Sequence, residues 1–101
     1  IRIGFMRIFQ TQDCSGREIY LTQERFKHIT EDHSEVFGYL SYFESILKHP
    51  EKTSIKENNK TIHYFYKHFK EKAFPRYLLL VVKYLNGEGF IITAYFVKET
   101  T

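Results

Sequence analysis

The chain has 101 residues, of which 43% are hydrophobic and 27% charged, and this size and composition predict one folded domain over residues 1–101. No stretch approaches the roughly 20 apolar residues that a membrane-spanning helix needs, so we expect no contact with a membrane. The one cysteine, Cys14, excludes an internal disulfide and a zinc site built from several cysteines, and it favours a reducing compartment such as the cytoplasm.

The basic residues are concentrated in the second half of the chain. Residues 1–47 hold five Lys and Arg against seven Asp and Glu, whereas residues 48–101 hold ten against five. Because Lys and Arg displace counterions from phosphates and aromatic rings stack on unpaired bases, this basic half indicates a nucleic-acid surface. An ordinary solvated surface has the same pattern, so both interpretations stay open. The candidate phosphate-binding residues are Lys60, Lys70, Lys72 and Arg76.

Two short strands are expected at the start of the chain. The spacing of apolar side chains predicts one strand over residues 1–9 and another over 17–21. Residues 11–16 between them are polar, and Asp13 and Gly16 are typical turn residues.

A helix is predicted from Thr22, a typical N-cap, to His33. At 100° per residue, Phe26, Ile29 and His33 fall on one side of this helix, whereas His28 falls on another.

A second helix is predicted over residues 34–47, with Ser34 as its N-cap. The His49-Pro50 pair ends it, because proline cannot continue the helical hydrogen bonds. The apolar stripe of this helix consists of Val36, Phe37, Leu40, Phe43 and Leu47.

Four consecutive strands are expected in the rest of the chain, over residues 52–56 and 61–69 and in the two arms of a hairpin within 78–97. Asn86-Gly87 between two apolar runs is the strongest short-range signal for a hairpin. The first arm is apolar on both faces, which predicts a central strand. The fold class is therefore α+β: short N-terminal strands, two helices, then a four-stranded antiparallel sheet with the helices on one face.

The second arm of the hairpin has two distinct faces. The period of two places Phe90, Ile92, Ala94 and Phe96 on one face and Ile91, Thr93, Tyr95 and Val97 on the other. The hydroxyls of Thr93 and Tyr95 thus point together from a rigid strand. Thr and Tyr are also common strand residues, so a purely structural role is the alternative.

The spacing of the five histidines does not indicate a metal site, and we expect no cofactor. His28 and His33 are five residues apart on a helix, about 140° around the axis, whereas a spacing of four would bring two ligands together. His63 and His68 are five apart on a strand and face opposite sides.

The remaining polar residues suit a reaction without a cofactor, the cleavage of RNA by its own 2′-hydroxyl. This reaction needs a base, an acid, and cations or hydroxyl donors for the charge that develops around phosphorus. His33 is also a candidate core residue, because it aligns with Phe26 and Ile29. The candidates for the reaction are His28, His33, Tyr66, Lys67, Arg76, Thr93 and Tyr95.

The stretch YLTQERFKHITEDHSE, residues 20–35, with Thr93-Ala94-Tyr95 resembles the phage-associated branch of the Barnase-EndoU-colicin-RelE-like nuclease superfamily. The resemblance covers about residues 16–98. Ser34 replaces a proline of the family pattern, and Phe26 stands where tryptophan is common. The positions that fall on the pattern are His28, His33, Tyr66, Lys67, Thr93 and Tyr95.

The resemblance implies a metal-independent endoribonuclease, and the superfamily includes toxins. We therefore expect cleavage of tRNA or another structured RNA by 2′-hydroxyl transphosphorylation. The expected roles are general acid or base for His28, donors to the phosphate for Thr93 and Tyr95, and charge stabilisation for Lys67, with His33 and Tyr66 ranked second. A toxin would act in the cytoplasm of the cell that makes it or in that of a target cell. An immunity protein or antitoxin would be its partner.

Two alternatives remain. The first is a binding module without catalysis, which holds nucleic acid on a basic sheet or docks a protein on a degenerate nuclease fold. It predicts RNA binding with steep salt dependence and no product. The second is an interaction domain whose exposed tyrosines form a protein interface.

Overall fold

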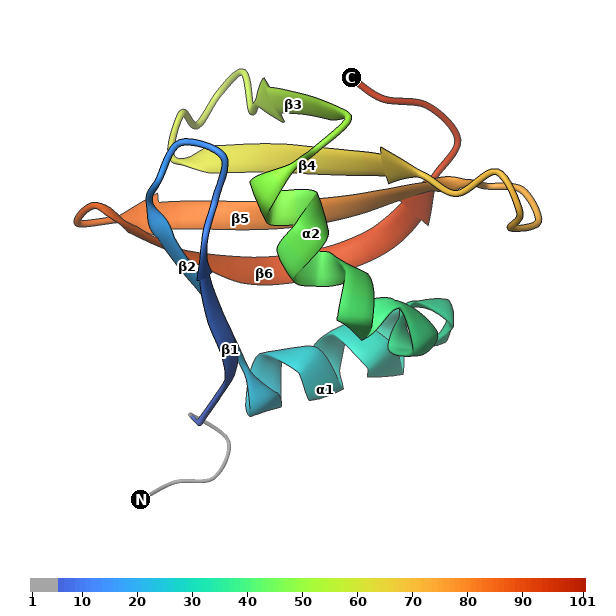
Figure 1. Ribbon diagram of the computed structural model, residues 1–101, viewed down its shortest axis with the longest axis horizontal. Coiled ribbons are helices and arrows are strands. Elements are labelled where there is room, and N and C mark those ends of the chain that lie inside the picture. The colour runs from blue at the N-terminus through green and yellow to red at the C-terminus, as the bar shows by residue number, and fades with distance from the viewer. Residues whose placement is uncertain (1–5) are drawn as a thin grey trace.

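Six strands and three helical segments follow one another in residues 6–101, the part of the chain that the computed structural model describes. The strands join in the order β1-β2-β6-β5-β4-β3 (Figure 1). The elements are β1 (Arg7–Gln12), β2 (Glu18–Thr22), α1 (Gln23–Asp32), the 3-10 helix η2 (Ser34–Tyr42), α2 (Phe43–Lys48), β3 (Lys52–Ile55), β4 (Ile62–His68), β5 (Tyr77–Leu85) and β6 (Glu88–Val97).

The four predicted strands, β3 to β6, pair antiparallel as expected, but the N-terminal strands join the same sheet, so the predicted extent of the sheet is wrong. β2 pairs in parallel with the start of β6, and the sheet is therefore mixed and six-stranded in the described residues. Gly89 permits this pairing because it has no side chain at the place where the Ile19 side chain of β2 lies. A Cβ on Gly89 would lie 2.5 Å from Ile19 Cδ1 and 2.9 Å from the Tyr84 ring.

The first strand lies further along the chain than the predicted range of 1–9. Residues 1–5 of that prediction lie outside the described residues, and β1 continues to Gln12. Thr11 and Gln12, predicted as turn, pair instead with β2. The turn begins at Asp13, whose carboxylate provides the hydrogen bonds that close it.

Asp13 fastens the β1–β2 turn to the centre of the sheet. Its Oδ1 accepts hydrogen bonds from the backbone N–H groups of Ser15 at 2.8 Å and Arg17 at 3.0 Å. Its Oδ2 accepts a hydrogen bond from the Tyr84 hydroxyl on β5. Burial alone raises the pKa of Asp13, but the hydrogen bonds from Ser15, Tyr84 and Arg17 outweigh burial and hold this pKa below its ordinary value.

The first helix follows the prediction. The Thr22 hydroxyl accepts a hydrogen bond from the Arg25 N–H at 3.1 Å and so caps α1. Ile29 is buried, and Phe26 packs against the core beside it. β2 pairs with β6 only as far as Phe90, and α1 begins directly after β2. α1 therefore lies beside the remaining length of β6 (Figure 1).

The predicted helix over 34–47 is divided into η2 and α2. In a 3-10 helix, residues three apart share a side, and Val36 and Tyr39 both pack into the core in this way. Phe37, predicted as part of the apolar stripe, is 70% exposed and stacks on Phe26. Gly38 in the middle of the segment weakens its preference for an α-helix.

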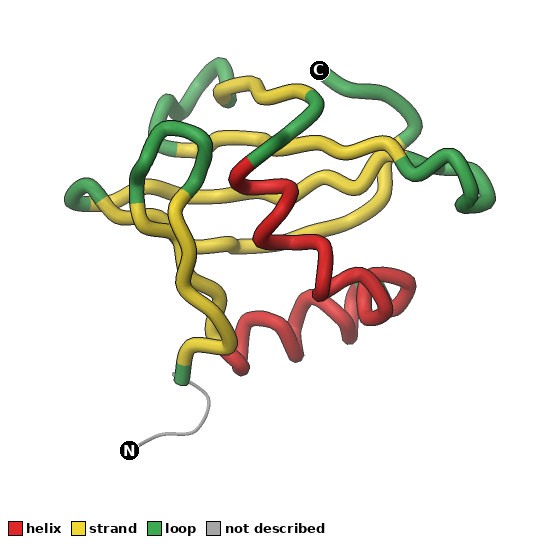
Figure 2. Tube along the Cα trace, in the orientation of Figure 1, coloured by secondary structure: helices red, strands yellow, loops and turns green. Residues whose placement is uncertain are grey.

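The helices cover one face of the sheet, as predicted (Figures 1 and 2). β5 is the central strand between β4 and β6, and its side chains alternate between two apolar clusters. The main core joins Leu78, Leu80 and Val82 of β5 to the helices. We call the other side the open face; its apolar cluster contains Ile62, Tyr64, Tyr66, Leu79, Val81, Ile92, Tyr95 and Val97.

The hairpin prediction is confirmed, and its register is defined by a two-residue turn. Leu85 pairs with Glu88, and Asn86 and Gly87 have φ values of 55° and 80°, which this type of turn requires. A bulge opposite β5 leaves Ile92 without a partner in the pairing. Ile92 therefore joins the open face and Ile91 lies in the main core, so the predicted faces of these two residues are wrong.

Two further findings bear on the predictions. No helix in residues 6–101 is both long and apolar enough to cross a membrane. Cys14 is a free, exposed thiol.

We predict that Gly89→Ala lowers the free energy of unfolding by about 1–3 kcal/mol, because the added methyl group overlaps Ile19 and the Tyr84 ring. Urea denaturation measures the change. Gly38→Ala is the control, since its Cβ meets nothing within 4 Å, and we expect it to be neutral or stabilising. Equal effects of the two substitutions would contradict the explanation of the β2–β6 pairing.

Asp13→Asn is expected to destabilise the protein at neutral pH by about 1–3 kcal/mol, because an amide cannot accept all of the hydrogen bonds that converge on the carboxylate. The lowered pKa of Asp13 stabilises the fold above the pKa of the unfolded chain, about 4, and this contribution is lost as the pH falls below it. The difference between wild type and variant should therefore shrink in urea denaturation at about pH 3. A difference that does not change with pH would contradict the assignment.

Candidate active site

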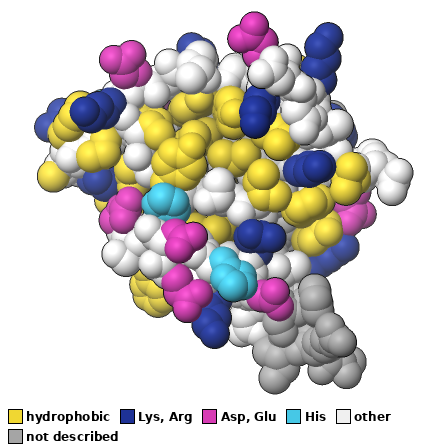
Figure 3. All heavy atoms as spheres, turned by 180° about the vertical axis from the view of Figure 1, so that it is seen from behind, with side chains coloured by type: hydrophobic (Ala, Val, Ile, Leu, Met, Phe, Trp, Pro, Cys, Tyr) yellow, Lys and Arg dark blue, Asp and Glu magenta, His cyan; other side chains and the backbone are white. Residues whose placement is uncertain are grey.

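The open face carries the two hydroxyl residues predicted from the second arm of the hairpin. Thr93 pairs with Val81 and Tyr95 with Leu79, and the side chains of both partners lie in the open-face cluster. Thr93 and Tyr95 therefore point from the same side of β6, as their spacing predicted. Figure 3 shows this side of the molecule, with apolar side chains across its middle, Lys and Arg around them and histidine at the border.

His33 brings an imidazole ring onto Tyr95. The two rings stack with their centroids 5.0 Å apart and their planes 26° apart. The backbone N–H of His33 donates to the Ile29 carbonyl at 2.8 Å and so ends α1 at this position. His33 is half-exposed, which decides against the core role that its alignment with Phe26 and Ile29 allowed. The imidazole, the phenol and the Thr93 hydroxyl thus belong to one small area of the surface.

The environment of Tyr95 keeps its phenol protonated. Burial, followed by the neighbouring phenols of Tyr64 and Tyr66, raises the pKa of Tyr95 above its ordinary value. A neutral phenol at this position is a hydrogen-bond donor at physiological pH. Such a donor can stabilise negative charge on a phosphoryl oxygen.

Tyr66 lies on the open face but is covered. Its side chain is 1% exposed, and its hydroxyl lies 2.7 Å from the Thr101 hydroxyl. Thr101 also lies 3.1 Å from Ser54 on β3, and Lys52 donates to Thr100 at 3.1 Å. Residues 100–101 thus lie across β3 and β4 on the open face, and the Tyr66 hydroxyl is engaged in this contact with the C-terminal residues.

His28 is on a different side of α1 from His33, as predicted. Its ring nitrogens lie 3.9 Å from Glu24 and 3.7 Å from Glu31, and its side chain is 58% exposed. The rise of an α-helix places His28 about 7.5 Å before His33 along the axis. The structure therefore gives His28 acidic neighbours on its own helix, whereas His33 contacts the sheet.

The structure does not bring Lys67 together with Thr93 and Tyr95. Lys67 pairs with Leu78, whose side chain lies in the main core, so Lys67 points from the helix-covered face. Its Nζ lies 3.4 Å from Glu51. The sheet itself separates this ammonium group from the open face.

The predicted nucleic-acid-binding residues do not form one surface. Lys60 precedes β4, while Lys70, Lys72 and Arg76 follow it, and a strand of seven residues is about 23 Å long. Lys72 Nζ donates to the carbonyls of Ala73 and Pro75 at 3.0 and 2.8 Å. Arg76 Nε donates to the Lys72 carbonyl at 2.8 Å. Lys72 and Arg76 thus hold the loop after β4 in shape.

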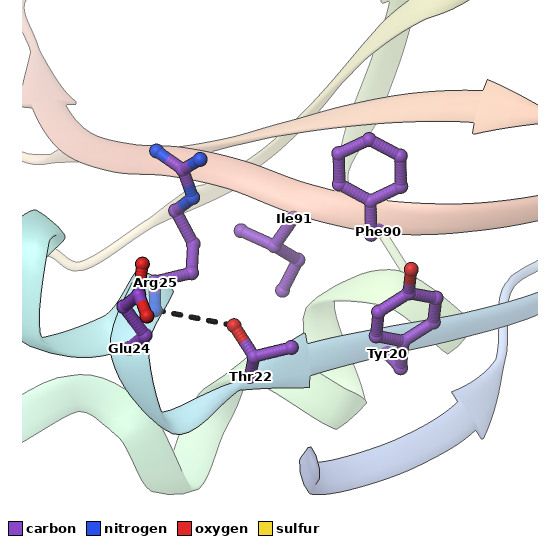
Figure 4. A pocket seen from close by; sticks show the side chains of 6 residues that line it. All are labelled: Tyr20, Thr22, Glu24, Arg25, Phe90 and Ile91. Atoms are coloured by element: carbon purple, nitrogen blue, oxygen red, sulfur yellow. Dashed lines mark hydrogen bonds between the residues drawn. The ribbon is translucent and has the colours of Figure 1, made fainter. Parts of the chain in front are cut away.

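A hollow of about 190 Å³ lies where β2 and β6 diverge, and it involves residues that the sequence did not single out. Figure 4 shows Arg25 reaching from α1 toward β6, with Tyr20 and Phe90 side by side at the other end. The Tyr20 and Phe90 rings have centroids 5.9 Å apart. Only the parallel register brings them together, so no local pattern of the sequence signals this hollow.

The described residues contain no group of three or more His, Cys, Asp or Glu side chains arranged as metal ligands. The open face offers an imidazole and hydroxyls, which can move protons and donate hydrogen bonds.

The fold and this face define an α+β domain with helices on one side of a sheet and an imidazole, phenols and a threonine hydroxyl on the other. Over residues 3–101 the chain matches the family model described as phage-Barnase-EndoU-ColicinE5/D-RelE like nuclease2. The chain belongs to this nuclease family, and the resemblance stated from the sequence is confirmed. Comparison with curated proteins and with solved structures gave no match.

We predict that Tyr95→Phe makes the loss of stability at alkaline pH less steep. The folded state holds the Tyr95 proton above pH 10, where the unfolded chain releases it, so the free energy of unfolding falls as the pH rises past about 10. Urea denaturation between about pH 9 and 11 measures this slope for wild type and variant. Identical slopes would show that Tyr95 titrates alike in the folded and unfolded states.

Proposed function

We propose that this nuclease-family domain is a metal-independent endoribonuclease that cleaves RNA through attack of a 2′-hydroxyl on the adjacent phosphate. The observation that carries the proposal is the stacking of His33 on Tyr95, with Thr93 on the same open face. These residues supply an imidazole, which can accept and donate a proton, and two hydroxyl donors.

In the proposed reaction, His33 removes the proton of the 2′-hydroxyl, and the 2′-oxygen forms a bond to phosphorus. The bond from phosphorus to the 5′-oxygen breaks, and this oxygen leaves with a proton supplied by an acid. The products are a 2′,3′-cyclic phosphate and a 5′-hydroxyl. Thr93 and Tyr95 donate hydrogen bonds to the phosphoryl oxygens as negative charge develops on them. His28, the other histidine of α1, is the candidate for the acid.

Lys67 has no part in this proposal, because it points from the opposite face of the sheet. Tyr66 supports Tyr95 by raising its pKa and does not itself face the substrate while Thr101 covers it. The weighting of the two histidines thus differs from that of the sequence analysis, since His33, and not His28, stacks on Tyr95.

The proposed substrate is tRNA or another structured RNA, and the proposed role is that of a toxin acting in the cytoplasm of its own or a target cell. An immunity protein or antitoxin is the corresponding partner. The second candidate function is a non-catalytic nucleic-acid-binding module on the nuclease fold. The position of Lys67 favours this alternative, because the predicted charge-stabilising cation is missing from the open face.

The test is incubation of the purified domain with mixed tRNA in the presence of EDTA, followed by analysis of the fragment ends. We expect discrete fragments with 2′,3′-cyclic phosphate ends. His33→Ala should lower the cleavage rate by about 100-fold or more, since positioned general acid–base groups contribute that much. Thr93→Val and Tyr95→Phe should each lower it by about tenfold or more, through loss of one donor.

His49→Ala is the matched control, because His49 is an exposed histidine at the end of α2, on the helix-covered side. His28→Ala tests whether the second histidine supplies the proton to the leaving 5′-oxygen. Binding of RNA that weakens steeply with salt, without any product, would replace the enzyme proposal by the binding module. Full activity of His33→Ala would remove His33 from the mechanism.

A further inference from the structure

We propose that the hollow between Tyr20, Arg25 and Phe90 is a subsite for an unpaired nucleotide of the substrate, beside the cleavage centre. This inference rests on the proposed function, because it takes a single-stranded RNA segment as the ligand. The hollow has a volume of about 190 Å³ and is lined by Tyr20, Thr22, Glu24, Arg25, Phe90 and Ile91.

The geometry of the sheet creates the hollow. The parallel ladder of β2 and β6 ends at the Tyr20–Phe90 pair. β2 then diverges from β6 while it stays paired with β1, and α1 begins after Thr22. The first turn of α1 therefore stands beside the free edge of β6, and Arg25 crosses the gap toward that strand (Figure 4).

Two aromatic rings offer a stacking surface at this point. Tyr20 and Phe90 are half-exposed, with their centroids 5.9 Å apart and their planes tilted by 32°. The Arg7 guanidinium lies 3.8 Å from the centroid of the Tyr20 ring, so Phe90 is the ring left for an incoming base. A second hollow of about 310 Å³ flanks the same two rings on the side of Asn86 and Glu88. The Tyr20–Phe90 pair thus projects between two recesses, as a stacking platform does.

Arg25 supplies the charge that a nucleotide needs. It is exposed, and it forms no ion pair within 4.0 Å among residues 6–101, whereas Arg7 pairs with Glu88 and Arg17 with Asp13. A guanidinium group without a carboxylate partner, next to an aromatic pair, can bind a phosphate while the base stacks on the ring.

The position of the subsite fits the proposed chemistry. Phe90 lies three residues before Thr93 on β6, but the bulge at Ile92 makes them pair with Lys83 and Val81, which are two residues or about 7 Å apart along β5. A bound RNA strand would therefore run along β6, with its phosphate at Thr93 and a neighbouring unpaired base at Phe90. The substrate class that follows is RNA with an unpaired nucleotide next to the cleaved bond, as in a loop or a single-stranded end.

The test measures binding of a short single-stranded RNA of mixed sequence with 2′-O-methyl groups, which lack the attacking hydroxyl and so separate binding from cleavage. Phe90→Leu keeps an apolar side chain and removes the stacking ring, and we expect it to weaken binding by about 5- to 100-fold. Arg25→Gln should weaken binding and reduce the salt slope by about 0.7, the value for one phosphate on a single strand.

Two matched controls lie outside the hollow. Phe37→Leu removes an exposed ring from η2, and Lys27→Gln removes a cation from another side of α1. Both should bind the RNA as the wild type does. We expect Phe90→Leu to have no effect on binding of the same sequence as a duplex, because paired bases cannot stack on the ring.

The outcomes separate this subsite from the nuclease proposal. Loss of binding in Phe90→Leu and Arg25→Gln, with wild-type binding in Phe37→Leu and Lys27→Gln, supports the subsite even if no RNA is cleaved. Wild-type affinity in both subsite variants overturns it, even if the domain cleaves RNA. Absence of binding by the wild type, or an equal loss of duplex binding in Phe90→Leu, also overturns it.

Discussion

The rest of the structure depends on the docking of the β1–β2 hairpin onto β5 and β6. A buried carboxylate, Asp13, closes the hairpin turn and accepts a hydrogen bond from Tyr84 in the central strand. Gly89 leaves room for Ile19 directly beside this point. Burying a carboxylate is costly unless its hydrogen bonds are satisfied, so this contact is specific as well as stabilising. It sets the parallel register of β2 against β6.

This register determines where the helices and the site lie. Because β2 passes directly into α1 at Thr22, the parallel pair directs α1 along the edge of β6. The end of α1 then places His33 on Tyr95, while its first turn places Arg25 beside Phe90. The helices occupy one face of the sheet and leave the other for these polar groups (Figures 1 and 3). The pairing of β2 with β6 thus positions both His33 at the proposed cleavage centre and Arg25 at the proposed subsite.

The candidate site divides into a part that local patterns predict and a part that they do not. The period of two placed Thr93 and Tyr95 on one face, and the pairing of β5 with β6 agrees. Lys67 was grouped with them by residue type and by the family pattern, although its strand position assigns it to the face of Leu78. The bulge at Ile92 also escaped the pattern, because an extra residue in a strand changes the alternation without a local signal in apolar side chains.

The sequence by itself determined the α+β class, the start of α1 at its Thr22 cap and the two-residue turn at Asn86-Gly87, because capping and turn geometry are set by neighbouring residues. Family membership also follows from short motifs in order along the chain. Only the tertiary structure decided the mixed sheet and the approach of Tyr20 to Phe90. These contacts join segments far apart in the chain, and they depend on the fit of side chains around Gly89 and Tyr84, which periodicity does not encode.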